Sequence, residues 1–578
     1  MCDAKNPLGV KVVDHYPWDD PPDACCIIEM PDENVADSLS EAFKQWCYGQ
    51  PVMITAPTGS GKTTLVIKIA GYCHKRTPDK WVLLLVSRKA IAIQQMQIFA
   101  SKLGSKWAKI ADPEVFELFE VLDDIHVIIA TYQGFAAHHD KFPLDKVDWV
   151  IFDEAHVFHA DSLFNPQLDQ LFWKLPNMFS HAHRLYLTAT PDSIIHDICA
   201  AEEQNLTECA SCHHWHCHGK GKLRFYKFPA HYQHINLRYF RERSEVIELV
   251  KQNPAEQFLL FTSNKEDLEN PKKTAYSKQF SEAGISWGYL DSERKGTALW
   301  KRICKDGTFD GQVLIATSVL DCGVNLKGSR LRHIVVESTD QMEFLQMIGR
   351  RRLEKQDNLT VYIKAYSREA IVNRLSSTEK ALGFISNAYT MIHNGNSDAL
   401  LYRGWMDESK QRPYMHSLNY LGNGAVLPKL TTKHYLRWQQ MHLERLLELY
   451  DLYGDDSALP RMVHQWLGQS DAYSPDRWLD YDQKLNAKAK LFALLEDHIN
   501  TIFTKDDFQS FSKDVLELVN RLQVFAHDNS DKTNRKADTV NKRLRYLHIP
   551  YEFHKNGQGK AATYTLARTE GRCEQQLL

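Results

Sequence analysis

A glycine-rich run lies directly behind an apolar segment in the first part of the chain. The segment PVMIT at 51–55 is followed at once by APTGSGKTT at 56–64. Glycines in such a run let backbone N–H groups surround phosphate oxygens at the start of the next helix. Lys62 is placed to reach the β- and γ-phosphates of a nucleoside triphosphate, and Thr63 is placed to hold Mg²⁺. The predicted nucleotide-binding residues are Ala56, Pro57, Thr58, Gly59, Ser60, Gly61, Lys62, Thr63 and Thr64.

Two adjacent acids end a second apolar run, VIFDEAH at 150–156. Asp153 is expected to complete the Mg²⁺ site with Thr63, and Glu154 to orient and deprotonate an attacking water. A pair of surface acids is the alternative interpretation. Because carboxylates at the end of a buried strand are costly unless they meet a cation, the pattern favours catalysis.

Short apolar runs of this kind alternate with helical patterns over most of the chain. Continuous apolar strands separated by helices are typical of parallel sheets covered on both faces. We therefore predict two α/β domains in tandem, with a hinge near Pro229. The predicted strands are 51–55, 81–87, 126–131, 148–153 and 184–189 in the first domain, and 257–261, 312–317, 333–338 and 359–365 in the second.

The last third of the chain has a different pattern. Strands are predicted to stop near residue 370, and one helix is expected from an N-cap at Thr432 to a stop at Gly454. Segment 532–560 holds eight basic and two acidic residues, a charge of +6 in a chain whose total is −3. A basic helix at 533–550 and a hairpin at 551–567 predict a winged-helix-like unit that grips nucleic acid. A solvated basic surface is the alternative.

The order of motifs over residues 50–355 resembles the DEAH/DEAD-box superfamily-2 helicases. The matching segments are APTGSGKT (56–63), SRKAIAIQQ (87–95), ATYQ (130–133), DEAH (153–156), TAT (188–190), FTS (261–263), ATSVLDCGVN (316–325) and QMIGRRR (346–352). The resemblance implies two RecA-like domains that bind ATP and Mg²⁺ between them and a nucleic-acid strand across them. It implies that Gln346 and Arg350 face the γ-phosphate.

Further roles come from the same resemblance. It assigns backbone contacts with nucleic acid to Arg88, Thr131 and Thr317, and coupling of hydrolysis to movement to His156, Thr188 and Thr190. The chain departs from the family at Leu353, where a second arginine is usual, so Arg351 and Arg352 are alternative replacements. No adenine-reading glutamine motif precedes residue 56, which leaves base selectivity open and favours DNA over RNA.

A Cys/His-rich run, CASCHHWHCH at 209–218, leaves two interpretations open. Cys209, Cys212 and Cys217 have half of the spacing of a structural zinc site, but no second CxxC follows them. A reduced Cys/His-rich loop near the interdomain hinge, which needs no metal, is the other interpretation. The twelve cysteines in no dense framework predict reduced thiols and a cytoplasmic location.

Composition limits the class of protein. With 43% hydrophobic and 25% charged residues, the chain is expected to be globular, and no apolar run is long enough to span a membrane. We predict an N-terminal extension (1–30), an ATP-binding domain (31–230), a second RecA-like domain (231–370), a helical accessory region (371–500) and the basic unit (501–578). The predicted activity is ATP-dependent movement along nucleic acid. There are two alternative functions. One is a nucleic-acid-binding regulator that does not separate strands, and the other is a small-molecule ATPase.

Overall fold

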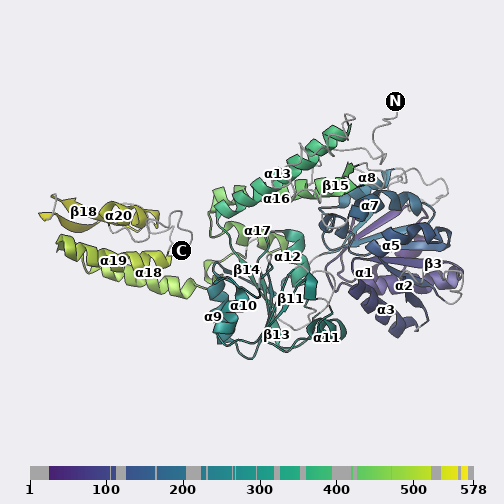
Figure 1. Ribbon diagram of the computed structural model, residues 1–578, viewed down its shortest axis with the longest axis horizontal. Coiled ribbons are helices and arrows are strands. Elements are labelled where there is room, and N and C mark those ends of the chain that lie inside the picture. The colour runs from purple at the N-terminus through teal and green to yellow at the C-terminus, as the bar shows by residue number, and fades with distance from the viewer. Residues whose placement is uncertain are drawn as a thin grey trace.

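A computed structural model gives the arrangement of the chain (Figure 1). It describes residues 22, 25–104, 106–111, 125–162, 166–203, 223–229, 232–262, 265–266, 268–294, 296–317, 326–351, 359–393, 418–420, 426–469, 472–522, 536–547, 549–557 and 561–569. Among these residues, no helix combines the length and the apolar character that crossing a membrane requires.

The first domain is built on an eight-stranded parallel sheet. Its strands, in spatial order, are β1 (Cys25–Glu29), β8 (Leu223–Lys227), β2 (Pro51–Thr55), β7 (His183–Thr188), β6 (Val147–Phe152), β3 (Trp81–Val86), β5 (Val127–Thr131) and β4 (Ala108–Ile110). In β3, Leu83 and Leu85 enter one core cluster, whereas Val82 and Leu84 enter another. Both faces are therefore buried, which explains why the strand is apolar at every position.

The second domain repeats this plan with six parallel strands. They are, in spatial order, β11 (Trp287–Leu290), β12 (Val313–Ala316), β10 (Gln257–Phe261), β13 (Leu331–Val336), β14 (Leu359–Lys364) and β9 (Ile235–Phe240). The prediction of two tandem parallel-sheet domains is confirmed, and Pro229 lies between β8 and β9. The sequence did not predict β1, β4, β8, β9 and β11, most of which are outer strands with mixed polarity.

Helices connect the strands of both domains. In the first domain these include α2 (Lys62–Arg76), α3 (Lys89–Leu103), α5 (Tyr132–His138), α6 (Val157–Ala160), α7 (Pro166–Met178) and α8 (Ile195–Ala201). In the second they include α9 (Arg243–Gln252), α10 (Tyr276–Glu282), α11 (Ala298–Asp306) and α12 (Gln341–Ile348).

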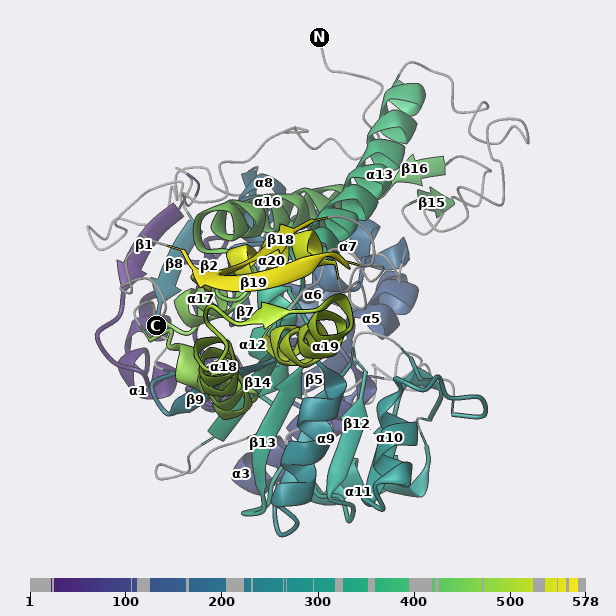
Figure 2. The same cartoon turned by 90° about the vertical axis from the view of Figure 1, so that its left-hand side faces the viewer.

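Two long helices, α13 (Arg368–His393) and α16 (Leu430–Tyr453), pack against each other above both domains (Figures 1 and 2). The strands do not stop at residue 370, because β15 (Leu418–Tyr420) and β16 (Val426–Pro428) form a short antiparallel pair. Helix α16 ends before Gly454 as predicted, but it begins at Leu430 and not after Thr432. Lys429 is its N-cap, because the Thr431 and Thr432 hydroxyls bond to the first domain instead.

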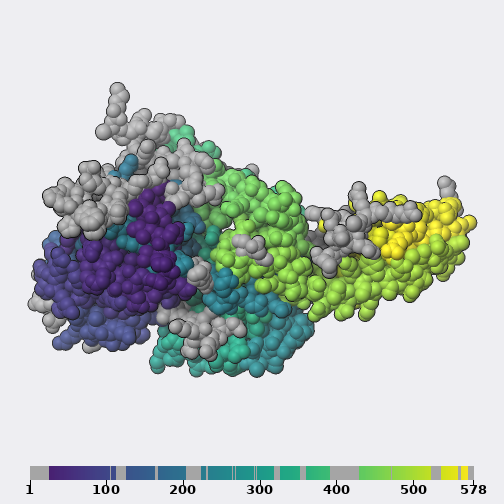
Figure 3. Space-filling model, turned by 180° about the vertical axis from the view of Figure 1, so that it is seen from behind, coloured from purple at the N-terminus to yellow at the C-terminus, as the bar shows by residue number. Residues whose placement is uncertain are grey.

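The last unit projects from the body of the molecule (Figures 1 and 3). Its elements are α18 (Tyr481–Glu496), β17 (Ile502–Phe503), α19 (Lys505–Leu522), α20 (Ala537–Tyr546), β18 (Tyr551–Asn556) and β19 (Thr563–Arg568). This order of helices and strands is that of a winged-helix unit, and Figure 2 shows the elements gathered together. Leu491 and Leu495 of α18 belong to its core, so the unit begins before residue 501. The other predicted boundaries stay predictions.

Candidate functional site

A pocket opens at the carboxyl edge of the first sheet, where β2 and β6 end on either side of β7. Parallel strands bring the segments that follow them to one edge, which is why residues 58–64 meet Asp153 and Glu154. The pocket is lined by Thr58, Gly59, Gly61, Lys62, Thr63, Thr64, Ile91, Gln94, Gln95, Ile98, Asp153, Glu154 and Arg350. Arg350 is the one lining residue that the second domain supplies among those described.

The remaining predicted site residues lie beside the pocket and do not line it. Ala56 and Pro57 present their carbonyl oxygens to Lys62 Nζ, at 2.6 and 3.1 Å. The Ser60 carbonyl accepts a hydrogen bond from the Val35 backbone N–H. Gln346 contacts His156. The structure therefore brings together most of the predicted set around a single loop.

The loop has the backbone of a phosphate-binding turn. Gly59 and Gly61 have φ of 88° and 93°, in the left-handed region, and Gly61 caps α2. A side chain at 61 would place a Cβ 2.8 Å from Asn34 Oδ1, so only glycine fits. Ala56 is not among the residues with positive φ. The alanine at the position where the motif usually has glycine therefore adds no strain of this kind.

Lys62, Asp153 and Glu154 of the pocket have perturbed pKa values; Lys62 is buried, whereas the two acids are partly buried. Burial lowers the pKa of Lys62. Burial and the neighbouring Glu154 charge raise the pKa of Asp153 to about 7. Burial opposes the charge of Glu154, but His156, Lys62 and Arg350 outweigh it and keep its pKa below the usual value. Two partly buried carboxyl groups thus share a site whose one lysine is already bonded to carbonyl oxygens.

This arrangement fits a triphosphate with a divalent cation. Glu154 Oε2 is buried and accepts no hydrogen bond from any described residue, and His156 Nδ1 lies 3.5 Å from it. Glu154 also has a φ of 53°, a conformation that costs energy for a residue with a side chain. A cation would offset the repulsion between the two carboxylates, and the residues nearest to hold it are Thr63 and Asp153.

Gln95 lines the pocket, although no role is predicted for it from the sequence patterns. It lies on α3, it is 9% exposed, and its Nε2 is 3.4 Å from Thr63 Oγ1. The Gln95 amide therefore orients the hydroxyl that is expected to meet Mg²⁺. Its place in the helix after Arg88 was visible in the sequence, but no pattern indicated that the side chain turns toward the glycine-rich loop.

The predicted coupling residues form one connected group. His156 Nδ1 lies 2.9 Å from Thr188 Oγ1, and the Thr190 N–H donates to the same oxygen at 3.1 Å. Gln346, from α12 of the second domain, contacts Nε2 of His156. A Cβ on Gly349 would lie 2.8 Å from Thr58 Oγ1, so the domains touch closely beside the pocket.

The residues assigned to nucleic-acid contact lie at the same edges of the two sheets but outside the pocket. Arg88 forms a two-bond ion pair with Asp161. Thr131 caps α5 and accepts a hydrogen bond from the Gly134 N–H. Thr317 follows β12, and its N–H donates to the Leu290 carbonyl.

Two predicted features fall partly or wholly outside the described residues. Arg351 is described, but it turns away from the pocket and donates from Nε to the Leu331 carbonyl at 3.1 Å. Arg352 and the cysteines Cys209, Cys212 and Cys217 are not described, so the second arginine and the zinc alternative stay predictions. In the part of the chain that is described, no group of three or more His, Cys, Asp or Glu is placed to hold a metal ion.

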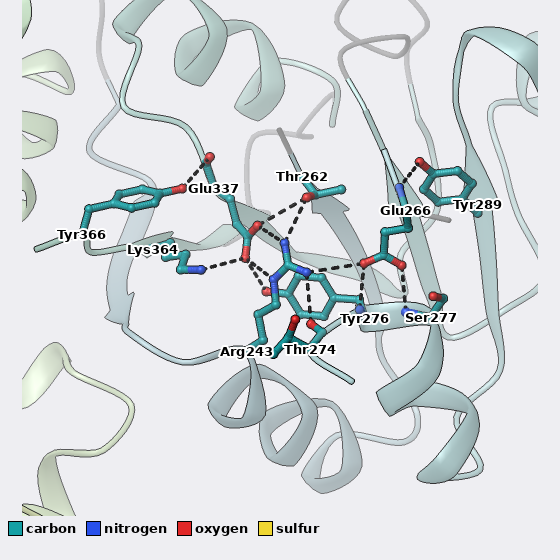
Figure 4. A network of polar contacts seen from close by, with 10 residues as sticks. All are labelled: Arg243, Thr262, Glu266, Thr274, Tyr276, Ser277, Tyr289, Glu337, Lys364 and Tyr366. Atoms are coloured by element: carbon teal, nitrogen blue, oxygen red, sulfur yellow. Dashed lines mark hydrogen bonds and ion pairs between the residues drawn. The ribbon is translucent and has the colours of Figure 1, made fainter. Parts of the chain in front are cut away.

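A closed polar network occupies the carboxyl edge of the second sheet (Figure 4). Arg243 donates to both carboxylate oxygens of Glu337, at 3.0 and 2.6 Å. Tyr276 donates to Glu337 as well, and Lys364 Nζ lies 3.7 Å away. Burial opposes the Glu337 charge, but the Arg243 hydrogen bonds outweigh it and lower the pKa of Glu337. The network joins α9 to the end of β13.

The basic segment of the last unit is partly turned inward. Arg543 is 6% exposed and donates to Asn520 Oδ1 at 2.6 Å, so it does not belong to the surface that its charge suggested. Tyr546, an aromatic side chain 62% exposed, lies beside the outward-facing positions of α20. Within segment 532–560, the basic residues that are described and exposed are Lys536, Lys542, Arg545 and Lys555.

Two family models match the chain. Residues 31–193 match "Type III restriction enzyme, res subunit", and residues 242–352 match "Helicase conserved C-terminal domain". No protein with a curated description matches the sequence.

Solved structures similar to the chain share little sequence with it. Dbp5 of S. cerevisiae, bound to RNA and ADP BeF3, is 16% identical with a TM-score of 0.40 and covers 54% of this chain and 79% of its own. Mss116p bound to ssRNA and AMP-PNP is 12% identical with a TM-score of 0.41 and covers 68% and 93%. The DUF1998 helicase MrfA bound to DNA is 17% identical with a TM-score of 0.39 and covers 60% and 53%. Similarity this low assigns no function.

The two matched segments coincide with the two parallel-sheet domains, and the glycine-rich loop lies in the first of them. The pocket receives residues from both segments. The first parallel-sheet domain therefore carries a segment similar to the res subunit of type III restriction enzymes, and the second carries a segment similar to the helicase conserved C-terminal domain.

Proposed function

We propose that the chain is an ATP- and Mg²⁺-dependent helicase or translocase of the DEAH type that acts on nucleic acid, with DNA favoured over RNA. The observation that carries the proposal is the convergence of Lys62, the two acids Asp153 and Glu154, and Arg350 of the second domain on a single pocket. Buried, perturbed titratable groups in a cleft are typical of catalytic sites.

Each pocket residue has a distinct task in this proposal. Lys62 and the loop N–H groups bind the β- and γ-phosphates, and Thr63 and Asp153 hold the metal. Bound Mg²⁺ supplies charge neutralisation at the phosphate oxygens. Glu154 holds the attacking water and accepts its proton, for which a pKa below the usual value keeps the carboxylate ionised.

The second domain contributes to the transition state and to coupling. Arg350 enters the pocket next to Glu154, where a guanidinium stabilises the charge that develops on the transferred phosphoryl group. Gln346 contacts His156, so a shift of the second domain alters the surroundings of the acids. Opening and closing between the domains is thereby linked to hydrolysis.

Nucleic acid is proposed to lie along the carboxyl edges of the two sheets. Arg88, Thr131 and Thr317 lie at these edges, outside the ATP pocket. The winged-helix-like unit, with Lys536, Lys542 and Arg545 exposed on or beside α20, favours a duplex as an additional contact. We propose a cytoplasmic location on the basis of the cysteine usage described above.

A second candidate is a nucleic-acid-binding regulator that uses the same ATPase as a switch. The closed contact between Gln346 and His156 serves a switch as well as a motor. Strand displacement separates the two, because only the motor releases a labelled strand from a partial duplex in the presence of ATP.

The decisive assay is ATP turnover alone and with single-stranded DNA, duplex DNA and RNA. We expect turnover to rise at least tenfold with single-stranded DNA and less with RNA. An ATPase that none of these polymers stimulates would contradict the proposal. A protein without ATP turnover would contradict both candidates.

A further inference from the structure

A buried carboxylate outside the ATP pocket is held between two histidines. Asp197 of α8 accepts hydrogen bonds from His159 Nε2 and His434 Nδ1, each at 2.6 Å. The side chains of Asp197 and His159 are 0% exposed and that of His434 is 4% exposed. The three residues come from α8, α6 and α16, elements that are distant in the sequence.

The positions of the three side chains are fixed by the charge on Asp197 and its two hydrogen bonds. Burial opposes the charge on Asp197, but the two imidazoles outweigh it and hold its pKa below the usual value. A buried carboxylate that loses one of its donors is left with an uncompensated charge. The two short hydrogen bonds therefore fix α6, α8 and α16 relative to one another.

The cluster lies directly behind the catalytic acids. Helix α6 continues from the acidic turn, which we define as Asp153–His156. The Val157 N–H donates to the Glu154 carbonyl at 2.9 Å, and the His159 N–H donates to the His156 carbonyl at 2.9 Å. A displacement of His159 is thus transmitted along hydrogen-bonded backbone to the acidic turn.

Asp197 also links the cluster to the segment that holds the predicted coupling residues Thr188 and Thr190. It lies on α8, which follows Thr188 and Thr190 at the end of β7. The acidic turn and this segment are already joined by the contact between His156 and Thr188. The cluster is therefore a second link between the same two segments.

Helix α16, which supplies His434, is anchored in the second domain. Leu443, Leu446 and Tyr450 of its later turns belong to that domain's core cluster, and the Tyr450 hydroxyl donates to the Tyr366 carbonyl. Figure 1 shows α16 running from above the second domain to the first. Helix α16 thus extends from the second domain to the first, and its first turn contacts the first domain.

We propose that His434 is a positioning residue for the acidic turn: through Asp197 and His159 it holds α6, and so the turn that carries Glu154, in place. Its consequence for catalysis rests on the proposed ATPase function. The later turns of α16 pack in the core of the second domain. The hydrogen bond from His434 to Asp197 therefore forms only when the first turn of α16 is packed against the first domain.

The test uses the full chain and four substitutions. His434→Leu removes the donor to Asp197, and His434→Asn keeps an N–H at the position of Nδ1. Thr431→Val is the matched control, because Thr431 Oγ1 makes a buried 2.8 Å hydrogen bond to Asp169 of α7 from the same turn of α16. Asp197→Asn, which keeps the shape and removes the charge, is a second variant should His434→Leu fail to fold.

Two measurements are made on each variant without nucleic acid. Amide hydrogen exchange over residues 150–161 reports the order of the acidic turn. ATP turnover and the affinity for a fluorescent ATP analogue report catalysis and binding separately. We expect His434→Leu to speed exchange at 153–160 and to lower kcat ten- to a hundredfold, as misplaced catalytic groups do, with less than a threefold change in affinity. His434→Asn is expected to restore both values.

The outcomes are separable. Unchanged exchange at 153–160 in His434→Leu would overturn the positioning role. An equal loss of kcat in Thr431→Val would also overturn the positioning role, because any weakened contact between α16 and the first domain would then have the same effect. A wild-type protein without ATP turnover would contradict the proposed function, while the exchange data would still decide the role of His434.

Discussion

The carboxyl edges of the two parallel sheets use buried charges in opposite ways. In the first domain the pKa of Asp153 is raised to about 7, whereas in the second the pKa of Glu337 is lowered. Burial acts in the same direction on both carboxyl groups. The difference lies in their cations, because Lys62 bonds to the Ala56 and Pro57 carbonyls, whereas Arg243 bonds directly to Glu337.

This contrast separates a site from a structural network. At the first edge, the acids are left for a ligand to neutralise, which costs stability in the absence of that ligand. At the second edge, the charges neutralise one another and hold α9 against β13 (Figure 4). The two parallel-sheet domains thus use their carboxyl edges differently, one to leave acids for a ligand and the other to form a stabilising network.

Among the variants that compare the two domains, the largest effect is expected from Arg350, the pocket residue that the described part of the second domain supplies. Arg350→Ala removes charge stabilisation from the transition state, so turnover should fall on the order of 10³-fold with little loss of ATP affinity. Steady-state turnover and equilibrium binding of an ATP analogue measure the two quantities. Equal losses of turnover and affinity would show that Arg350 acts in ground-state binding. A parallel Arg352→Ala variant would show whether Arg352 is the second arginine that stabilises the transition state.

The network of the second domain should respond in stability and not in catalysis. Glu337→Gln leaves the Arg243 guanidinium without its carboxylate, so the free energy of unfolding should fall by about 3–5 kcal/mol. Urea unfolding measures this loss. The kcat of the protein that remains folded is expected to stay within a factor of about three of the parental value. If Glu337→Gln lost kcat strongly without losing stability, the edge of the second sheet would take part in catalysis and would not be a purely structural network.

The two edges should also show opposite dependence on pH. Folded Asp153 keeps its proton up to a pKa of about 7, above its ordinary value of 3.8, so its contribution to stability falls as pH rises between these values. The lowered pKa of Glu337 gives a contribution that is lost as pH falls through its folded-state pKa. In metal-free protein, the gain in Tm from Asp153→Asn should therefore grow from pH 5 to pH 8.

The Tm difference between Glu337→Gln and the parental protein serves as the internal control, because it should stay constant from pH 5 to pH 8 and shrink only below the ordinary glutamate pKa of 4.5. A gain in Tm from Asp153→Asn that is the same at pH 5 and pH 8 would show that Asp153 is ionised throughout.

The smallest effect is expected at the projecting unit. Lys542→Gln with Arg545→Gln should lower the slope of log affinity against log salt by about 0.7–0.9 for each lost phosphate contact. Turnover without nucleic acid should not change. Point substitutions are preferable to truncation at residue 532, which would remove α20, β18 and β19 from the core that they share with Leu491 and Leu495. An unchanged slope would make the unit a solvated or protein-binding surface.

Local patterns predicted the parts of the site that lie next to one another in the sequence. The glycine-rich loop and the acidic turn were placed correctly at the ends of buried strands, because apolar runs and positive-φ glycines are visible in short windows. The helix stop at Gly454 was predicted for the same reason.

Contacts between distant segments had no such signal. The bonds from His434 to Asp197 and from Thr431 to Asp169 join residues more than two hundred positions apart, so Thr432 was expected to cap a helix whose first turn is in fact seated on the first domain. Arg543 was counted with a basic surface because charge is visible in the sequence, whereas its bond to Asn520 is not.

The central claim is that the first edge hydrolyses ATP with Glu154 as the base, and the most direct test is Glu154→Gln. We predict that this protein binds an ATP analogue in the presence of Mg²⁺ as tightly as the parental chain does, but turns ATP over about 10²–10⁴-fold more slowly. Lys62→Ala, measured beside it, should lose affinity and turnover together. Turnover by Glu154→Gln at the parental rate would contradict the account.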